Sequence, residues 1–349
     1  MALTRLRNEA IQCIVFGGKG GVGKTTMATA TALELAKAKR TLLFTTDPAP
    51  ALTHSFGQAI GSEPTAVVGV PNLFAMEING RSVVEEFKIT YGKDIYELLQ
   101  KGTYLSRSET LEMYQLDIPG LEELMRLKKI TNVLERADYE LYIIDTAPTS
   151  QTLQLLVLPD MLDHWIRFFA KMRWKHKILI GAFARGKYLE QVDAFLLEMK
   201  KTVKKVKALL QNGEKTEFVM VARAEKTLLS ETDELLGSLA RLSIPSRELL
   251  VNYLLPPEAP GSAEQWNRRK SPRSLAAPLF FHAPVHYRQA LDFAERRRKT
   301  QTRYIEELQE TLHSLNITRV PLQPTEIQGI EHLQQLGAYL FTEAEEASA

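Results

Sequence analysis

The chain has 349 residues, a formal net charge of +2 and hydrophobic side chains at 44% of its positions. This near balance of charge gives no global attraction to nucleic acid or to an anionic membrane, so we expect no nucleic-acid partner. The single cysteine, Cys13, excludes a disulfide framework and a zinc site of several thiolates within one chain. Because no apolar run reaches the roughly 18 residues that span a bilayer, we expect a cytoplasmic protein without stable membrane insertion.

The N-terminal part of the chain predicts the start of a parallel sheet. Residues 11–16 form an apolar run typical of a strand, and a helical stretch begins at residue 24. A second buried strand is expected at 41–47. A strand, a loop, a helix and a further strand in this order indicate an α/β fold with helices on the faces of the sheet.

Later apolar runs predict that the sheet continues, with strands expected at 73–78, 141–145, 217–222, 248–252 and 317–322. Between them, residues 83–101 and 161–211 repeat apolar side chains at three- and four-residue spacing, which indicates helices. We therefore expect one domain over residues 1–349, with a helical subdomain inserted from about 81–131 and 160–211. A mobile connection is expected at 256–275 and a long amphipathic helix at about 285–315.

The loop between the first strand and the first helix has the spacing of a phosphate-binding loop. Residues 18–25 read GKGGVGKT, which satisfies the pattern G-x-x-x-x-G-K-[ST]. In such loops backbone N–H groups surround phosphate oxygens, Lys24 reaches the β- and γ-phosphates, and the Thr25 hydroxyl ligates Mg²⁺. The predicted nucleotide-binding residues of this loop are Gly18, Gly20, Gly21, Val22, Gly23, Lys24, Thr25 and Thr26.

Two aspartates, Asp47 and Asp145, end predicted strands. Ligands of open parallel sheets bind at the carboxyl ends of strands, so both aspartates are expected to face the phosphates. Asp145 is suited to support the Mg²⁺ shell, and Asp47 remains as the group that orients an attacking water. Turn formation and helix capping are the alternative roles of an aspartate in such places. The phosphate-binding loop in the same sheet favours the functional interpretation.

The segment KGGVGKTT, with its extra lysine Lys19, resembles the deviant Walker A loop of the MinD, ParA, nitrogenase-iron-protein and arsenite-pump superclass of dimeric ATPases. Further segments are similar to the family of arsenite-pump ATPases and GET-pathway ATPases that target tail-anchored proteins. Residues 45–56 resemble its switch I, 75–80 its A-loop, 118–124 a segment at its helical subdomain, 145–159 its switch II, and 251–258 and 320–333 its adenine-side loops.

This resemblance implies Mg²⁺-dependent ATP hydrolysis by a homodimer. Lys19, Lys24 and Asp47 are then the catalytic residues, with Lys19 crossing the dimer interface, while Thr25 and Asp145 hold the metal. Asn252 would contact adenine, and the loop 321–326, beginning at Pro321, would line the base. Without the resemblance, Asn252 reads as a turn residue at the end of a strand.

Three positions depart from the family pattern. Pro50 replaces a histidine in switch I, and Ser150 and Gln151 replace Gly-His in switch II. Because these positions couple the nucleotide state to dimer closure in the family, we expect slow hydrolysis without a client. The zinc-binding Cys-x-x-Cys of the targeting ATPases and the metalloid-binding cysteines of the pump ATPases are absent as well.

The resemblance implies that the ATPase carries or targets a client, for which a hydrophobic membrane-protein segment is the leading candidate. The aromatic and apolar residues of 161–183 would line a groove for it, or they form the core of the helical subdomain. Two alternatives remain open at this point: the energising ATPase of an arsenite-type anion efflux pump, and a positioning ATPase of the MinD/ParA type.

Overall fold

A computed structural model describes residues 3–46, 51–78, 121–146, 204–256 and 285–342, with short pieces at 83–85, 89, 167, 197 and 200–201. These residues form an eight-stranded sheet of order β3-β4-β2-β5-β1-β6-β7-β8, in which every pair is parallel except β3 with β4. The predicted α/β fold with a mostly parallel sheet is confirmed. The strands are β1 (Cys13–Gly17), β2 (Thr41–Thr45), β3 (Thr65–Ala66), β4 (Leu73–Glu77), β5 (Leu141–Asp145), β6 (Thr216–Arg223), β7 (Glu248–Leu254) and β8 (Asn316–Pro321).

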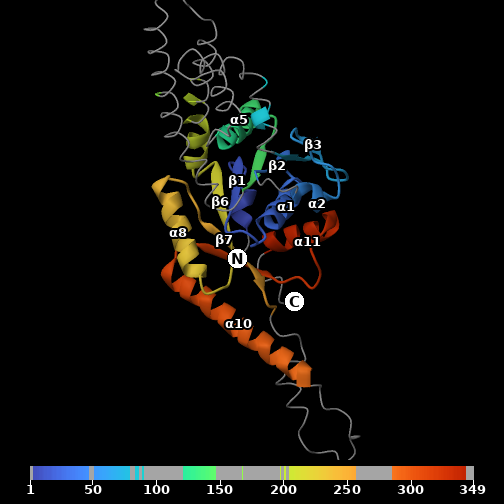
Figure 1. The fold of residues 1–349 in the computed structure, drawn as a ribbon, viewed down its shortest axis with the longest axis vertical. Helices are drawn as coiled ribbons and strands as arrows, with labels where there is room; N and C mark the ends of the chain where they lie inside the picture. The colour runs from blue at the N-terminus through green and yellow to red at the C-terminus, as the bar shows by residue number, and fades with distance from the viewer. Residues whose placement is uncertain are drawn as a thin grey trace, which may run out of the picture.

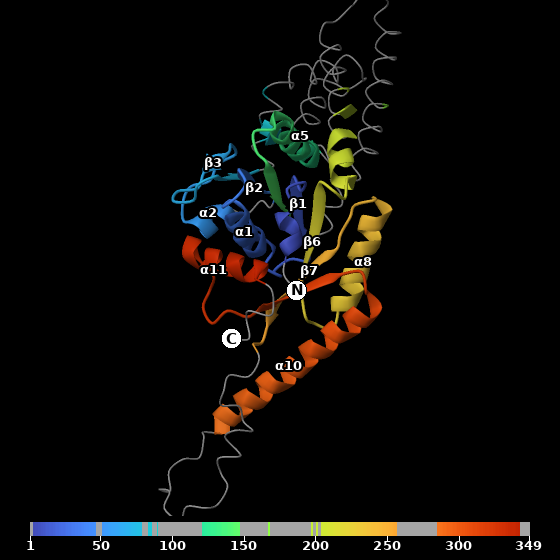
Figure 2. The ribbon, with the colours of Figure 1, turned by 180° about the vertical axis from the view of Figure 1, so that it is seen from behind.

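Helices cover both faces of this sheet. Figure 1 shows α1 and α11 on one side of the strands and α8 on the other, and Figure 2 shows the same layers from behind. The long helix α10 passes below the sheet, contacts α8, and projects beyond the body of the domain at its N-terminal end. The helices are η1 (Thr4–Arg7), α1 (Lys24–Leu35), α2 (Ala51–Phe56), α5 (Leu121–Arg136), α8 (Leu228–Arg241), α10 (Val285–Thr311) and α11 (Gly329–Phe341).

Alternate residues of the central strands supply two separate hydrophobic cores. In β1, Ile14 and Phe16 pack with the core beneath α1 and α11, whereas Cys13 and Val15 pack with the core beneath α5, α8 and α10. The strands β1, β2 and β5 have five residues each, and every one of these residues is buried. Such continuous apolar strands are typical of a parallel sheet covered on both faces. This packing holds the carboxyl ends of β1, β2 and β5 side by side.

The predicted strands agree with the observed ones to within two residues at nearly every end. The antiparallel edge strand β3 was not predicted, because its two residues are too few to give a periodic pattern. Of the expected helical subdomain, α5 and residues 204–211 are helical in the structure. The rest of 81–131 and 160–211 lies almost wholly outside the described residues, as does nearly all of 256–275, so those bounds stay predictions. Within the described segments, every helix is too short or too polar to span a bilayer.

Two buried glutamates lie at the edge of the sheet opposite the phosphate-binding loop. Glu217 and Glu248 stand at the amino ends of β6 and β7 and are 0% and 1% exposed. Glu217 accepts a hydrogen bond of 2.7 Å from the backbone N–H of Arg247, and Arg5 Nε lies 3.5 Å from its Oε2. The Asn316 amide donates a hydrogen bond of 2.7 Å to Glu248. Burial raises the pKa of both carboxyl groups to about 7, from an ordinary value of 4.5.

We expect the free energy of unfolding to fall as the pH rises from about 4.5 to about 7, because the folded state binds more protons than the unfolded state in this window. Glu248→Gln keeps an amide in place of the carboxyl group but removes the buried charge. It should therefore be more stable than the wild type at pH 8, by about 1–3 kcal/mol, and lose this advantage near pH 5. Urea unfolding at four pH values measures the difference. Glu135→Gln, which removes a surface partner of Lys205, is the control and should leave the pH dependence unchanged. Identical pH profiles for Glu248→Gln and the wild type would contradict the prediction.

Candidate nucleotide-binding site

The phosphate-binding loop joins β1 to α1 and depends on glycine at two close approaches. A Cβ on Gly18 would lie 2.1 Å from the carbonyl oxygen of Val221, so no larger residue fits against β6. Gly23 has φ of 96°, and a Cβ there would lie 2.5 Å from the side-chain nitrogen of Asn252. Both positions require glycine for reasons of space as well as backbone conformation. The glycines thus bring the loop against the ends of β6 and β7.

Lys24 and Thr25 begin α1, where backbone N–H groups and the helix dipole favour an anion. Lys24 is 7% exposed, and its Nζ donates a hydrogen bond of 3.1 Å to the carbonyl oxygen of Lys19, across the loop. The Thr25 hydroxyl donates a hydrogen bond of 2.7 Å to Oδ2 of Asp145. Two predicted site residues that are 120 positions apart in sequence therefore meet.

Asp145 ends β5 opposite Phe16 of β1 and Thr45 of β2, at the carboxyl edge of the sheet. It is fully buried, and the Thr45 hydroxyl donates a second hydrogen bond, of 3.0 Å, to the same Oδ2. A hydroxyl and a carboxylate side by side form an oxygen donor set that suits Mg²⁺, which uses few protein ligands and keeps several waters. Thr25 and Asp145 therefore fit the metal that the motif predicts. Thr45 was not predicted as a site residue, because its contact with Asp145 depends on the register of β2 and β5.

Asp47 lies outside the described residues. The last described residue before Asp47 is Thr46. Thr46 is buried, and its backbone N–H donates a hydrogen bond of 3.0 Å to the carbonyl oxygen of Asp145. The chain thus reaches the carboxyl edge of β5 one residue before Asp47. The role of Asp47 stays a prediction, and the departures at Pro50, Ser150 and Gln151 also fall outside the described residues.

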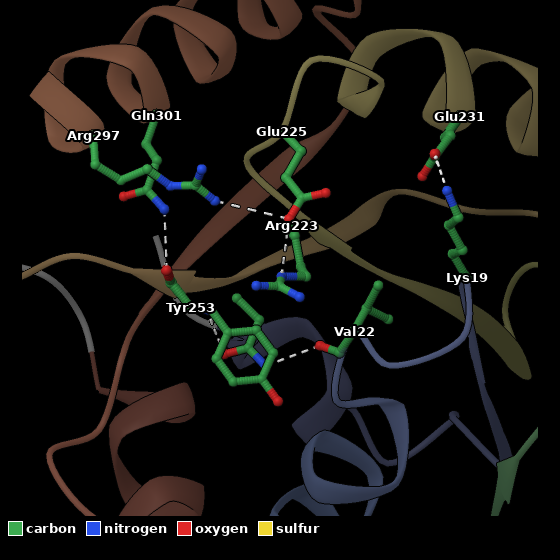
Figure 3. A network of polar contacts seen from close by, with 9 residues as sticks. Lys19, Val22, Arg223, Glu225, Glu231, Tyr253, Arg297 and Gln301 are labelled. Atoms are coloured by element: carbon green, nitrogen blue, oxygen red, sulfur yellow. Dashed lines mark hydrogen bonds and ion pairs between the residues drawn. The ribbon is translucent and has the colours of Figure 1, made fainter.

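Lys19 differs from Lys24 in exposure and in direction. Its side chain is 67% exposed and points away from the loop toward α8, where Nζ lies 2.9 Å from Oε1 of Glu231 (Figure 3). The hydrogen bond and the charge of Glu231 raise the pKa of Lys19. A cavity of about 370 Å³ between α8 and the sheet has both residues in its lining. Glu231 lies 212 positions from Lys19, and no sequence motif predicts the pair.

The other side of the loop is held by Asn252, near the end of β7. Asn252 is 5% exposed and donates a side-chain hydrogen bond of 3.0 Å to the carbonyl oxygen of Val22. Pro321 ends β8 and pairs with Leu254, two residues after Asn252. The structure thus brings Asn252 into contact with the phosphate-binding loop and places Pro321 on the strand next to it. Their contacts with a base remain predictions.

Comparison with known proteins gives the family of this chain. Residues 11–275 and 284–342 match the family described as "Anion-transporting ATPase". The chain belongs to this family. It is also 29% identical over 339 residues to "ATPase ASNA1 homolog 1" of Paramecium tetraurelia, an alignment that covers 95% of this chain and 92% of the relative. It is 28% identical over 343 residues to "ATPase get3" of Aspergillus terreus, with 96% of this chain and 92% of that relative covered.

Membership in the Anion-transporting ATPase family confirms the resemblance that the motifs indicated. The protein is an ATP-hydrolysing P-loop ATPase. The glycine-rich loop described above is thus part of an ATP-hydrolysing enzyme. Two residues near this site were not predicted from the sequence: Glu231, which pairs with Lys19 of the loop, and Gln301, which donates a hydrogen bond to Tyr253 next to Asn252.

Proposed function

We propose that this ATPase works in the cytoplasm as a Mg²⁺-dependent, nucleotide-switched homodimer that carries or targets a hydrophobic membrane-protein segment. The proposal is supported by the similarity along nearly the whole chain to proteins named "ATPase ASNA1 homolog 1" and "ATPase get3". The motifs that resemble GET-pathway targeting ATPases supply the nature of the client.

The observation that carries the dimer is the position of Lys19. The loop already has a buried lysine, Lys24, for the phosphates of its own subunit. The second lysine extends outward, and its partner is a glutamate on another helix. An exposed cation at the edge of a phosphate site can reach a nucleotide held by a facing subunit. With one phosphate-binding loop per chain, two copies related by a two-fold axis would each complete the site of the other.

Within one site, the residues of the loop and of the neighbouring strand ends have distinct tasks in the proposed mechanism. The backbone N–H groups of the loop bind the phosphates, and Lys24 neutralises charge on the β- and γ-phosphates. Thr25 and Asp145 would hold Mg²⁺, which when bound would supply positive charge that stabilises the phosphates. Asp47 would orient the attacking water. Lys19 from the partner would stabilise the charge that develops on the transferred phosphoryl group.

The family description makes an anion pump the second candidate. Binding of arsenite or antimonite requires several thiolates, because these soft ions select sulfur ligands. The only cysteine of the chain, Cys13, is fully buried in β1, and burial raises the pKa of its thiol to about 12. This thiol stays protonated and enclosed, so the client carrier is favoured over the metalloid pump.

The test uses Asp47→Asn, which should keep ATP binding and lose turnover because it removes the water-orienting carboxylate. The probe is a labelled peptide with about 20 consecutive apolar residues, long enough to span a bilayer. We expect the variant to keep the peptide in solution at least about tenfold more effectively with Mg²⁺-ATP than with ADP, a difference near 1.4 kcal/mol. A peptide with charges distributed through the same length is the control. Equal retention in the two nucleotide states would contradict the client switch, and wild-type turnover in the variant would contradict the role of Asp47.

A further inference from the structure

The backbone that follows Asn252 is held by one glutamine from a distant helix. Gln301 of α10 is 5% exposed, and both ends of its amide are used. Its Nε2 donates a hydrogen bond of 3.1 Å to the carbonyl oxygen of Tyr253 (Figure 3). Its Oε1 accepts a hydrogen bond of 3.0 Å from the N–H of Leu255. A single buried side chain thus fixes a donor and an acceptor of the chain at the end of β7.

This stretch of backbone has an unusual conformation that needs support. Tyr253 has φ of 59°, in the left-handed region that a residue with a side chain rarely adopts. The β7–β8 ladder shifts register between Val251 and Leu254, so strand pairing does not fix Tyr253. The guanidinium of Arg223 lies 4.9 Å from the centre of the Tyr253 ring and holds the side chain from β6. Gln301 therefore stabilises a conformation that the sheet alone does not determine.

A second layer of contacts ties α10 to the same place. Glu225, in the connection after β6, lies 3.4 Å from Arg223 and 3.8 Å from Arg297 of α10 (Figure 3). Arg297 stands one helical turn before Gln301. The two residues hold α10 against the ends of β6 and β7. These ion pairs are partly exposed, so the buried Gln301 is the stronger determinant of the geometry.

The held backbone leads directly to the phosphate-binding loop. The N–H of Tyr253 donates a hydrogen bond of 2.8 Å to the Asn252 side-chain oxygen, whose nitrogen donates to Val22. The Asn252 amide is thereby oriented from both sides. An amide nitrogen has two hydrogens, and the contact with Val22 uses one. The other suits an acceptor such as N1 of adenine, whereas N1 of guanine carries a hydrogen of its own.

We propose that Gln301 is a positioning residue that sets the preference of this ATPase for adenine by fixing the end of β7 and, through it, the amide of Asn252. The inference rests on the proposed nucleotide site and goes beyond it, because Gln301 contacts the backbone of Tyr253 and Leu255 and acts through Asn252. Through Gln301, α10 would contribute to recognition of the base, although this helix is far from the phosphate-binding motif in the sequence.

The test compares Gln301→Leu with the wild type in two measurements. Calorimetry gives Kd for ATP and for GTP. Hydrogen exchange follows the backbone N–H of Leu255, which loses its hydrogen bond to the Gln301 side-chain oxygen in the variant. We expect the Kd for ATP to rise about tenfold and that for GTP less than about threefold, so that discrimination falls. Exchange at Leu255 should accelerate. Gln309→Ala, an exposed glutamine on the same helix, is the matched control and should change neither.

Gln301→Glu gives an independent variant of the same size. It keeps an acceptor for the Leu255 N–H but has no donor for the Tyr253 carbonyl, so an intermediate loss of discrimination is expected. An unchanged ratio of ATP to GTP affinity in either folded variant would overturn the role of Gln301 but leave the proposed function intact. A wild type that binds both nucleotides equally would have the same consequence. A wild type that binds no ATP would overturn the proposed function, and this inference with it.

Discussion

Replacing Lys19 by alanine is expected to lower ATP turnover about 10³-fold, with little loss of ATP affinity. Cations supplied by a facing subunit to a transferring phosphoryl group accelerate hydrolysis by about 10³–10⁵. Lys19 is exposed and directed away from the loop, whereas Lys24 is buried within it. Removal of Lys19 should therefore leave the phosphate contacts within one subunit in place. Steady-state kinetics and calorimetry separate the two effects.

Mixing subunits tests whether Lys19 acts in the partner's site. Lys19→Ala and Asp47→Asn subunits should each be nearly inactive alone. In a mixed dimer, one site has an intact Asp47 and receives an intact Lys19, so part of the activity should return. Demonstrated subunit exchange without any recovery would reject the role in trans.

Two further variants separate this role from the ion pair of Lys19 within its own subunit. Glu231→Gln removes the charge that faces Lys19 and should keep turnover within about threefold of the wild type, because exposed ion pairs contribute little to stability. Lys215→Ala removes an exposed lysine at the opposite edge of the sheet and should have no effect. If Glu231→Gln is as slow as Lys19→Ala, the ion pair with α8 is what the ATPase requires.

The parallel sheet could be predicted from the sequence because its strands carry local signals. Apolar runs such as LYIID and EFVMVA indicate strands without knowledge of the neighbouring strands. The glycine spacing of residues 18–25 predicts a phosphate-binding loop followed by a helix. The meeting of Thr25 with Asp145 was predictable for a related reason: Asp145 ends β5, and Thr25 lies in the first turn of the helix that follows the loop after β1, at the same edge of the sheet.

Contacts made between distant elements could not be predicted in this way. Gln301 reaches Tyr253 only because α10 crosses below the sheet (Figure 1). In the sequence, Gln301 is one of many polar residues of α10, and nothing distinguishes it from the others. Thr45 is a typical strand residue whose hydroxyl matters because β2 aligns it with Asp145. The left-handed Tyr253 likewise has no signal in the sequence, since glycine or asparagine is the usual residue in that conformation.

Replacing Asp145 by asparagine should lower Mg²⁺-dependent turnover by about 10²–10³-fold, the typical effect of losing one preorganised electrostatic contact to a phosphoryl-transfer site. The asparagine side-chain oxygen can still accept the hydroxyl hydrogen bonds of Thr25 and Thr45, so the loop should keep its shape. The lost element is the negative charge, which in the proposed mechanism holds Mg²⁺ in place. Removing a buried charge should not destabilise the fold.

Titration with Mg²⁺ distinguishes this effect from general damage to the site. The half-maximal Mg²⁺ concentration should rise about tenfold or more in Asp145→Asn, while ATP binding without metal stays close to that of the wild type. Asp138→Asn, an exposed aspartate in the turn before β5, is the matched control and should behave like the wild type. If Asp145→Asn loses turnover with an unchanged Mg²⁺ requirement, the carboxylate of Asp145 does not act through the metal.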